Sequence, residues 1–245
     1  MQSKRVIGIQ SFCLRNFKTV ESLIEKTQEC GIENIEIFEG HCNVLDENTV
    51  GFVNKIKSEG IGIDSWFEGI PPELEQAKAF FKALKGFGCS VLVINDLPED
   101  LSLASSLCRE YGLKVALHNH GRKHAHGSVD ALEKLFDQTD DEIGLCLDTA
   151  WMQDSGEDPI EVAKKFSSRL YGIHIKDFVF NRAGTHQDVP VGDGNLDLPL
   201  LFTTLDAVDF DGPLILEYEG NPDNPVPEIK KCVENIEKAM EKQNG

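Results

Sequence analysis

Four of the seven histidines in this 245-residue chain lie within nine positions, in the stretch LHNHGRKHAHG (residues 117–127). They are His118, His120, His124 and His126. An imidazole can bind a divalent metal or transfer a proton near neutral pH. The cluster alone does not distinguish these roles, because a metal site needs further ligands from elsewhere in the fold.

Three other apolar runs end in groups that could complete such a site. Asp148 ends IGLCLD, His174 lies in LYGIHIKD, and Glu217 lies in GPLILEYE. Imidazole nitrogen and carboxylate oxygen together suit manganese, zinc, iron or cobalt. If the fold brings these run ends together, His118, Asp148, His174 and Glu217 are expected to bind one divalent ion.

Eight short runs rich in Val, Ile and Leu predict the strands that would position these residues. The runs cover residues 5–12, 34–39, 61–67, 90–95, 114–120, 143–149, 170–177 and 212–219. Nearly continuous apolar strands that alternate with helices indicate a parallel sheet covered on both faces. Eight such units in about 250 residues predict a single-domain (β/α)8 TIM barrel over residues 1–245, with its active site at the C-terminal ends of the strands. A doubly wound open sheet is the alternative, but no GxGxxG fingerprint follows the first run.

Local signals predict where several helices begin and end. Gly31 and Gly60 follow amphipathic stretches, at positions where a helix C-terminus favours a left-handed residue. Ser128 and Asp158 precede two further stretches and are expected to be N-caps. A last helix is expected from about Pro227 to Lys242.

Composition limits the classes of partner and the compartment. The net charge is −18, which disfavours binding to the phosphate backbone of nucleic acids. The chain has no apolar run of about 18 residues that could cross a membrane, and its N-terminus lacks the apolar core of a signal peptide. The seven cysteines are scattered without a CxxC pair, which indicates buried, reduced thiols. We therefore expect a cytoplasmic protein with a small-molecule partner.

The ordered motifs VALHNHG, IGLCLDTAW, LYGIHIKD, VPVGDGNLDLPLLF and LILEYEG resemble the sugar-phosphate isomerase/epimerase family. These xylose-isomerase-like TIM barrels are related to inosose dehydratases, ketose 3-epimerases and endonuclease IV. The resemblance covers essentially the whole chain. It implies one divalent metal held by His118, Asp148, His174 and Glu217, with Mn²⁺ expected first and Zn²⁺, Co²⁺, Fe²⁺ or Mg²⁺ as alternatives.

Two positions depart from the family pattern. His118 stands where many members have a metal-binding Glu, and Trp151 stands where many have the His of an LDxGH motif. Family epimerases generally use two carboxylates on opposite faces of the substrate, so the first change makes a two-glutamate epimerisation doubtful. The second change and the negative charge argue against a DNA-repair nuclease.

The resemblance implies a sugar or sugar-phosphate isomerase or epimerase that removes a proton next to a metal-bound carbonyl. Glu217 is the expected base, and His120 or Lys176 could supply a proton. The same groups suit a dehydratase or lyase acting on a keto-sugar, keto-glycoside or inosose, which is the first alternative. A non-catalytic sugar-binding barrel is the second. The residues name neither the sugar nor its phosphorylation state, and a homo-oligomer stays open.

Four further residues are expected to contact the substrate. Glu36 follows the second strand run, and Glu219 follows Glu217 on the same side of the last run. Trp66 and Trp151 could stack on the apolar face of a sugar ring.

The histidine cluster is expected to divide into two pairs. Side chains alternate along a strand, so His118 and His120 share one face, with His120 further towards the mouth. His124 and His126 come after the strand and are expected on the rim without a metal role. In the loop PVGDGNLD (190–197), Asp197 is expected to cap the following helix, and the glycines could allow a phosphate to approach.

Overall fold

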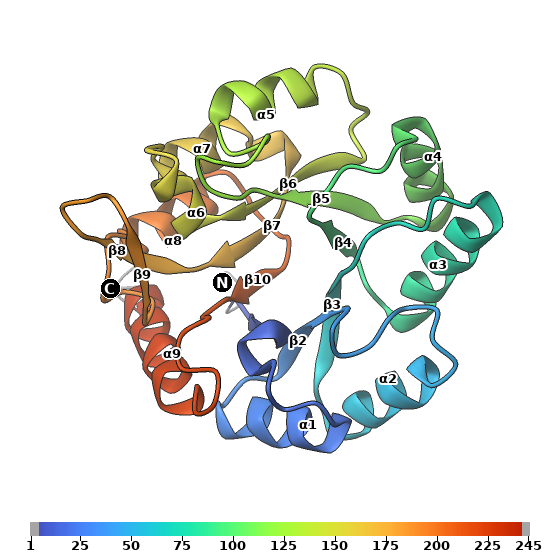
Figure 1. The fold of residues 1–245 in the computed structure, drawn as a ribbon, viewed down its shortest axis with the longest axis horizontal. Coiled ribbons are helices and arrows are strands. Elements are labelled where there is room, and N and C mark those ends of the chain that lie inside the picture. Colours follow the sequence, from blue (N-terminus) through green and yellow to red (C-terminus); the bar gives the residue numbers. More distant parts are fainter. Residues whose placement is uncertain (1–4, 242–245) are drawn as a thin grey trace.

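Eight parallel strands close into a barrel in the computed structural model, which describes residues 5–241 (Figure 1). Around the barrel the strands follow the order β1-β10-β7-β6-β5-β4-β3-β2. Barrel strands that are consecutive along the chain therefore lie side by side, and β10 follows β7 because β8 and β9 form a separate sheet. The barrel strands are β1 (Ile7–Gln10), β2 (Asn34–Phe38), β3 (Gly62–Phe67), β4 (Val91–Ile94), β5 (Lys114–His118), β6 (Ile143–Asp148), β7 (Leu170–Ile175) and β10 (Leu214–Leu216). The predicted (β/α)8 TIM barrel is confirmed.

Helices cover the outside of the barrel (Figure 1). They are α1 (Val20–Glu29), α2 (Thr49–Ser58), α3 (Leu74–Phe87), α4 (Leu101–Tyr111), α5 (Val129–Phe136), α6 (Thr149–Asp154), α7 (Pro159–Lys165), α8 (Leu198–Ala207) and α9 (Val226–Glu241), with the 3-10 turns η1 (Ser11–Leu14) and η2 (Ser167–Arg169). Among the described residues, no helix is long and apolar enough to cross a membrane.

The local helix signals agree with the structure. Gly31 and Gly60 follow α1 and α2 with φ of +75° and +81°, the left-handed region that glycine adopts without strain. The side chain of Ser128 accepts a hydrogen bond from the Ala131 amide, and that of Asp158 accepts one from the Ile160 amide. The last helix is observed to Glu241; its predicted end at Lys242 lies outside the described residues.

Apolar side chains fill two separate layers. The larger layer lies between the strands and the helices. The smaller one fills the barrel interior with Phe67, Val91, Val93, Ala116 and Cys146. The interior is therefore a packed core rather than a pore, and most of the buried polar side chains lie on the strands or just after their C-terminal ends.

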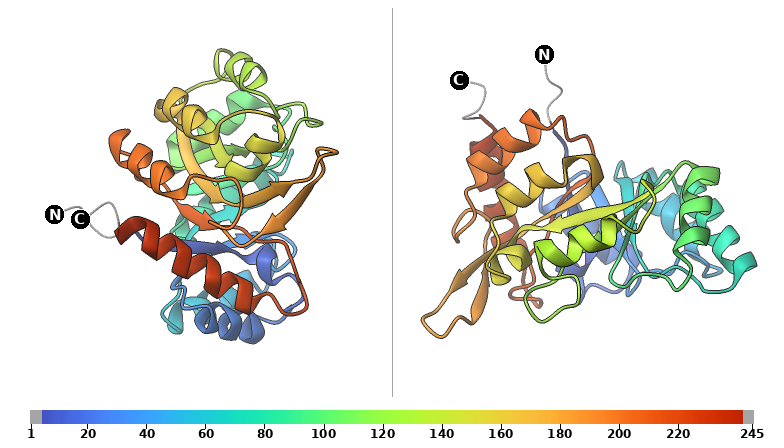
Figure 2. Two further views of the ribbon diagram at one scale, coloured as in Figure 1. Left: turned by 90° about the vertical axis from the view of Figure 1, so that its left-hand side faces the viewer. Right: turned by 90° about the horizontal axis from the view of Figure 1, so that it is seen from above.

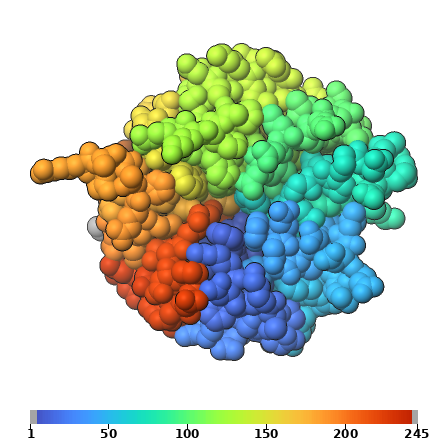
Figure 3. All heavy atoms as spheres, viewed as in Figure 1, coloured from blue at the N-terminus to red at the C-terminus, as the bar shows by residue number. Residues whose placement is uncertain are grey.

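A β-hairpin that the sequence did not predict follows β7. Its strands β8 (Asp177–Phe180) and β9 (His186–Val189) pair antiparallel and form their own two-stranded sheet. The hairpin stands out from the barrel beyond the ring of helices (Figures 2 and 3). The seventh strand had been predicted to run to residue 177, but it ends at Ile175, and Asp177 instead begins the hairpin.

Candidate metal centre and active site

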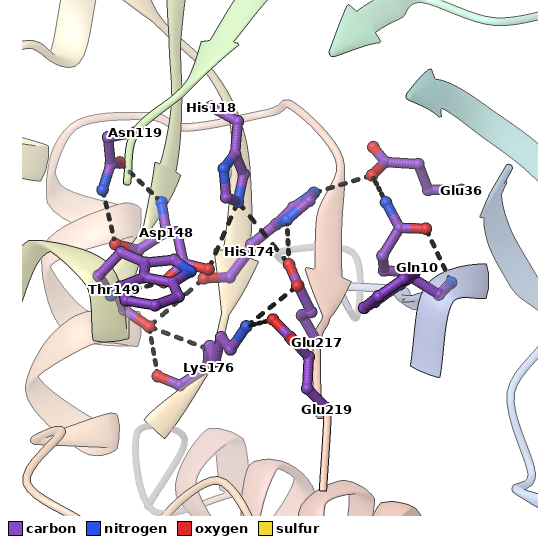
Figure 4. Close-up of polar contacts among 12 residues, drawn as sticks. Gln10, Glu36, His118, Asn119, Asp148, Thr149, His174, Lys176, Glu217 and Glu219 are labelled. Atoms are coloured by element: carbon purple, nitrogen blue, oxygen red, sulfur yellow. Dashed lines mark hydrogen bonds and ion pairs between the residues drawn. The ribbon is translucent and has the colours of Figure 1, made fainter. Parts of the chain in front are cut away.

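Four buried side chains from neighbouring strands converge at the C-terminal mouth of the barrel. His118 ends β5, Asp148 ends β6, His174 lies on β7, and Glu217 follows β10. Each offers one ligand atom, and these atoms all lie within 4.8 Å of one another. Figure 4 shows the four side chains pointing towards a common centre. The geometry thus brings together the four residues that the sequence suggested as metal ligands.

The unpaired atoms of this group fit a divalent cation. His118 Nε2 lies 3.4 Å from Asp148 Oδ2 and 3.7 Å from Glu217 Oε2. Within the described chain, Asp148 Oδ2 and both ring nitrogens of His118 are buried without a hydrogen-bond partner. Leaving such an atom unpaired costs about 1–3 kcal/mol, and a cation shared by Asp148 Oδ2 and His118 Nε2 would relieve that cost for both of these atoms. Two imidazoles and two carboxylates form a donor set typical of transition-metal ions.

The two oxygens of Asp148 have separate environments. Oδ1 accepts a hydrogen bond of 2.8 Å from the Trp151 amide and so caps α6. The backbone of Asp148 is held by the Asn119 side chain, which accepts from its N–H at 2.9 Å and donates to its carbonyl at 3.2 Å. The cap and the backbone bonds leave Oδ2 to face the metal centre.

Lys176 places a buried positive charge beside Glu217. Its Nζ lies 3.1 Å from Glu217 Oε1, contacts Glu219 Oε1, and is 4.0 Å from Asp188 Oδ2. Burial favours the neutral amine, but the surrounding carboxylates, Glu217 first, outweigh burial and raise the pKa of Lys176. Lys176 therefore stays an ammonium. Of the proposed substrate contacts, Glu219 lies here, paired with Lys176 (Figure 4).

Glu217 stays ionised for the complementary reason. Burial would raise its pKa, but Lys176 and the two histidines of the metal centre outweigh burial and hold the pKa of Glu217 well below its usual range. Opposing effects also act on the pKa of His118, which burial alone would lower. Asp148 and Glu217 outweigh that effect and raise the pKa of His118.

His120 and Trp151 lie next to the metal centre. The ring of His120 is 4.8 Å from that of His118 and 6.0 Å from that of Trp151. Trp151 is also 5.5 Å from Lys176 Nζ, so its ring lies near both groups that the sequence suggested as proton donors. Burial, followed by the neighbouring histidines, lowers the pKa of His120 to about 4, so its imidazole is neutral at pH 7.

His124 and His126 lie in the loop between β5 and α5, beyond the strand. The ring of His124 is 4.8 Å from that of His120, and the ring of His126 is 6.0 Å from that of His124. Neither belongs to the group of four whose ligand atoms converge.

The hairpin brings a carboxylate that the sequence analysis missed. Asp188 Oδ2 accepts from the Glu219 amide at 3.1 Å, and its Oδ1 is buried with no hydrogen-bond partner in the described part of the chain. Burial raises the pKa of Asp188 to about 7. The sequence did not point to this residue, because β9 (HQDV) is mostly polar and lacks the apolar run by which the barrel strands were predicted.

Aromatic and ionic contacts hold the hairpin against the mouth. The ring of His186 stacks on Phe178 at 4.2 Å and lies edge-on to Trp151 at 4.9 Å. Its Nδ1 lies 3.3 Å from Asp154 Oδ1, and Asp154 also pairs with Arg122 at 3.3 Å. The stack on Phe178 lies within the hairpin, whereas the contacts of His186 with Trp151 and Asp154 tie the hairpin to α6, which Asp154 joins through Arg122 to the loop that follows β5.

Two of the predicted substrate contacts lie away from the open mouth. Trp66 is fully buried and stacks on Phe87 of α3 at 5.7 Å, because its neighbours Ser65 and Phe67 are the residues of β3 that face the barrel interior. Glu36 does face inward but is 1% exposed, and both of its oxygens accept hydrogen bonds from protein side chains. The structure does not bring either residue to a position where a substrate could reach it.

The loop at residues 190–197 holds a carboxylate of the protein itself. The side chain of Asp177 accepts hydrogen bonds of 2.8–3.0 Å from the amides of Gly192, Gly194, Asn195 and Leu196. A Cβ at Gly194 would collide with Asp177 Oδ1, which explains the glycine. The amides that could have received a phosphate are therefore occupied. Asp197 caps α8 as predicted, accepting from the Leu200 amide.

The chain is similar in sequence to proteins named inosose dehydratase. An inosose dehydratase from Clostridium perfringens is 30% identical over 142 residues, which cover 51% of this chain and 47% of that protein. The match thus spans about half of that relative's length.

Two solved structures share the fold at low sequence identity. The IOLI protein with a bound zinc atom superposes with a TM-score of 0.77 at 15% identity, covering 97% of this chain and 99% of that one. The 3-keto-D-glucoside 4-epimerase of E. coli gives a TM-score of 0.72 at 16% identity, covering 96% and 100%.

Residues 93–239, more than half of the chain, match the family described as xylose isomerase-like TIM barrel. This match agrees with the closed parallel barrel and with the resemblance seen in the sequence motifs. The chain belongs to the xylose isomerase-like TIM barrel family.

Proposed function

We propose that this chain is a divalent-metal-dependent dehydratase that removes a proton next to the carbonyl of a keto-sugar or inosose and eliminates water. The carrying observation is the buried group of His118, Asp148, His174 and Glu217, whose ligand atoms lie within 4.8 Å of one another beside the ammonium of Lys176. The 30% identical relative is named an inosose dehydratase, which supports dehydration over isomerisation or epimerisation. The sequence alone had placed isomerisation or epimerisation first.

The four residues would hold one metal ion, which supplies Lewis-acid polarisation of a substrate oxygen. Two imidazoles favour Mn²⁺, Zn²⁺, Co²⁺ or Fe²⁺ over Mg²⁺, which prefers oxygen ligands. Mn²⁺ remains our first expectation. The ammonium of Lys176 is fixed between carboxylates and acts as a positive charge that stabilises the anionic oxygen formed when the proton leaves.

Two different groups would carry the protons of the elimination. Neutral His120 accepts the proton from the carbon next to the carbonyl, in place of Glu217, whose carboxylate is engaged by Lys176 and His174. Asp188, with a pKa of about 7, is protonated in a large fraction of molecules near neutral pH and donates its proton to the departing hydroxyl. The carbon–oxygen bond to that hydroxyl breaks, and water leaves.

Isomerisation is the second candidate, because it needs only one group that removes a proton and returns it to the neighbouring carbon. His120 alone could do this next to the metal. The epimerase from E. coli shares the fold and supports this alternative. A two-carboxylate epimerisation is less well supported, since His118 occupies one ligand position and the hydrogen bonds of Glu36 engage both of its oxygens.

Incubation in D₂O with metal-loaded protein tests the reaction class. A panel of inososes, keto-sugars and keto-glycosides would be followed by NMR and mass spectrometry. Loss of the mass of one water molecule, with an unsaturated product, supports dehydration. Deuterium in an isomer of unchanged formula would contradict dehydration and support isomerisation. Sugar binding without exchange or product would favour a non-catalytic barrel. The Asp148→Asn variant is the matched control, because it keeps the cap on α6 and changes the metal-facing oxygen.

A further inference from the structure

Both ring nitrogens of His174 contact a carboxylate. Nδ1 lies 2.6 Å from Glu217 Oε2, on the side of the metal centre. Nε2 lies 2.8 Å from Glu36 Oε1, on the opposite side of the ring. His174 comes from β7 and Glu36 from β2, so the contact crosses the barrel interior (Figure 4).

Donors from two further strands fix the Glu36 carboxylate. Gln10 Nε2 on β1 donates to Oε1 at 2.6 Å, and Ser65 Oγ on β3 donates to Oε2 at 2.6 Å. The orientation of the Gln10 amide follows from its other contact, because its Oε1 accepts from the Phe12 amide at 3.1 Å. The Gln10 nitrogen must therefore face Glu36, and Glu36 is the acceptor.

This arrangement selects one tautomer of His174. An ionised carboxylate only accepts hydrogen bonds, so the His174 nitrogen that faces Glu36 must carry a hydrogen. Nδ1 faces the ionised Glu217 and therefore also carries a hydrogen while no metal is bound. When a metal ion replaces that hydrogen, the contact with Glu36 keeps the other hydrogen on Nε2, so the lone pair that binds the metal is on Nδ1. A histidine that binds metal through one nitrogen typically donates the other N–H to a carboxylate, which fixes the ring and strengthens the ligand.

We infer that Glu36 is a positioning residue that fixes the ring and tautomer of His174 for metal binding, and is not a substrate contact. This inference rests on the proposed metal-dependent function. The location of Glu36 supports this assignment, because its side chain is 1% exposed. In the described part of the chain, His174 is the one basic side chain that forms an ion pair with Glu36. The negative charge of Glu36 therefore acts on the metal through His174.

Metal titration of chelator-treated protein tests the inference through Glu36→Gln. The amide has the same shape and can still accept from His174 and Gln10, so the variant removes the charge while keeping the packing. Zn²⁺ affinity, measured by competition with a chromophoric chelator, should fall by about 10- to 100-fold. The Co²⁺ absorption spectrum of the variant should shift, because the donor strength of His174 changes. Glu39→Gln, an exposed glutamate next to the same strand, should leave both readouts unchanged.

A second variant keeps the test decisive if Glu36→Gln folds poorly. Ser65→Ala removes one hydrogen bond from the carboxylate but leaves its charge, and should weaken Zn²⁺ binding by a smaller factor, about three- to tenfold. A merely structural role would lower the melting temperature of the metal-free variants without changing Zn²⁺ affinity or the Co²⁺ spectrum, and that result would overturn the inference alone. Wild-type protein that binds no Zn²⁺, Mn²⁺ or Co²⁺ would overturn the proposed function together with it.

Discussion

His118 and His120 are two residues apart on one face of the chain, yet their surroundings differ. His118 is buried with its Nε2 near two carboxylates, whereas His120 is half-buried beside Trp151. The alternation of side chains along β5 predicts that they share a face, and the 4.8 Å between their rings agrees with that prediction. The metal role of His118 and the proton role of His120 are proposals that substitutions can separate.

We expect the four clustered histidines to respond to substitution in three different ways. His118→Ala removes a metal donor and should weaken metal affinity by more than about 100-fold, beyond the usual effect of a supporting residue. His120→Ala should keep about one metal equivalent and lower kcat by about 10²- to 10⁴-fold. The double substitution of His124 and His126 by Ala should keep the metal. Metal analysis and steady-state kinetics measure these effects, and a metal-free double variant beside a metal-loaded His118→Ala would reverse the assignment.

Glu68, directly after β3, should make folding stability depend on pH. Burial raises its pKa to about 7, although it accepts hydrogen bonds from the Val44 amide and Trp66 Nε1. Between about pH 4.5 and 7 the folded state retains a proton that the unfolded chain has lost, so this group reduces stability as pH rises through that window. Glu68→Gln should therefore raise the free energy of unfolding by about 1–2 kcal/mol at pH 8, and by less at pH 5.

Urea unfolding of wild type and Glu68→Gln at both pH values measures the difference. The exposed Glu99→Gln should change stability at neither pH. An equal gain for Glu68→Gln at pH 5 and pH 8 would show that the carboxylate is not the source.

At the scale of elements, local chemistry predicted helix ends well and strand orientation less well. Ser128, Asp158 and Asp197 cap their helices as expected, because capping depends on one side chain and the next three amides. Trp66 was harder to place. It stands beside Phe67 at the end of an apolar run, and only the register of β3 decides which of the two faces inward.

Helix α2 offers the same substitution at two glycines with opposite expected effects. Gly60 follows the helix at φ +81°, where alanine is strained, so Gly60→Ala should reduce the free energy of unfolding by about 1 kcal/mol. Gly51 lies on the exposed face of α2, and a Cβ there meets no atom within 4 Å, so Gly51→Ala should add about 0.5–1 kcal/mol. Chemical denaturation measures both. Changes of the same sign would contradict the account of this helix end.

At the scale of the whole molecule, the barrel explains how much of the site the sequence could predict. Parallel strands end at one face of a closed barrel, so the polar ends of the runs at 114–120, 143–149, 170–177 and 212–219 had to meet. Contacts across the barrel were not predictable, because the strand order does not give the register of the strands, which decides which inward-facing side chains lie at the same height. The pairing of Glu36 with His174 is such a contact. Asp188 was missed because it reaches the site from a hairpin outside the barrel pattern.

The seven cysteines are free and buried throughout the two apolar layers, which confirms the prediction of buried thiols. Burial raises the pKa of Cys30, Cys89, Cys108 and Cys232 to about 12, and that of Cys146 to about 11. Thiolate is the reactive form, so native protein should react with Ellman's reagent at pH 8 much more slowly than free cysteine does. All seven thiols should react in guanidinium chloride. Rapid reaction of one native thiol would contradict the burial described here.

Metal stoichiometry of wild type and Asp148→Asn tests the central claim most directly. The substituted side chain can still cap α6 through its amide oxygen, but it places an amide nitrogen where Asp148 Oδ2 faced His118. After chelator treatment and dialysis against Mn²⁺ or Zn²⁺, wild type should retain about one equivalent by elemental analysis. The variant should retain almost none, with the melting temperature of its metal-free form unchanged. Equal metal content in the two proteins would show that the metal does not bind between His118, Asp148, His174 and Glu217.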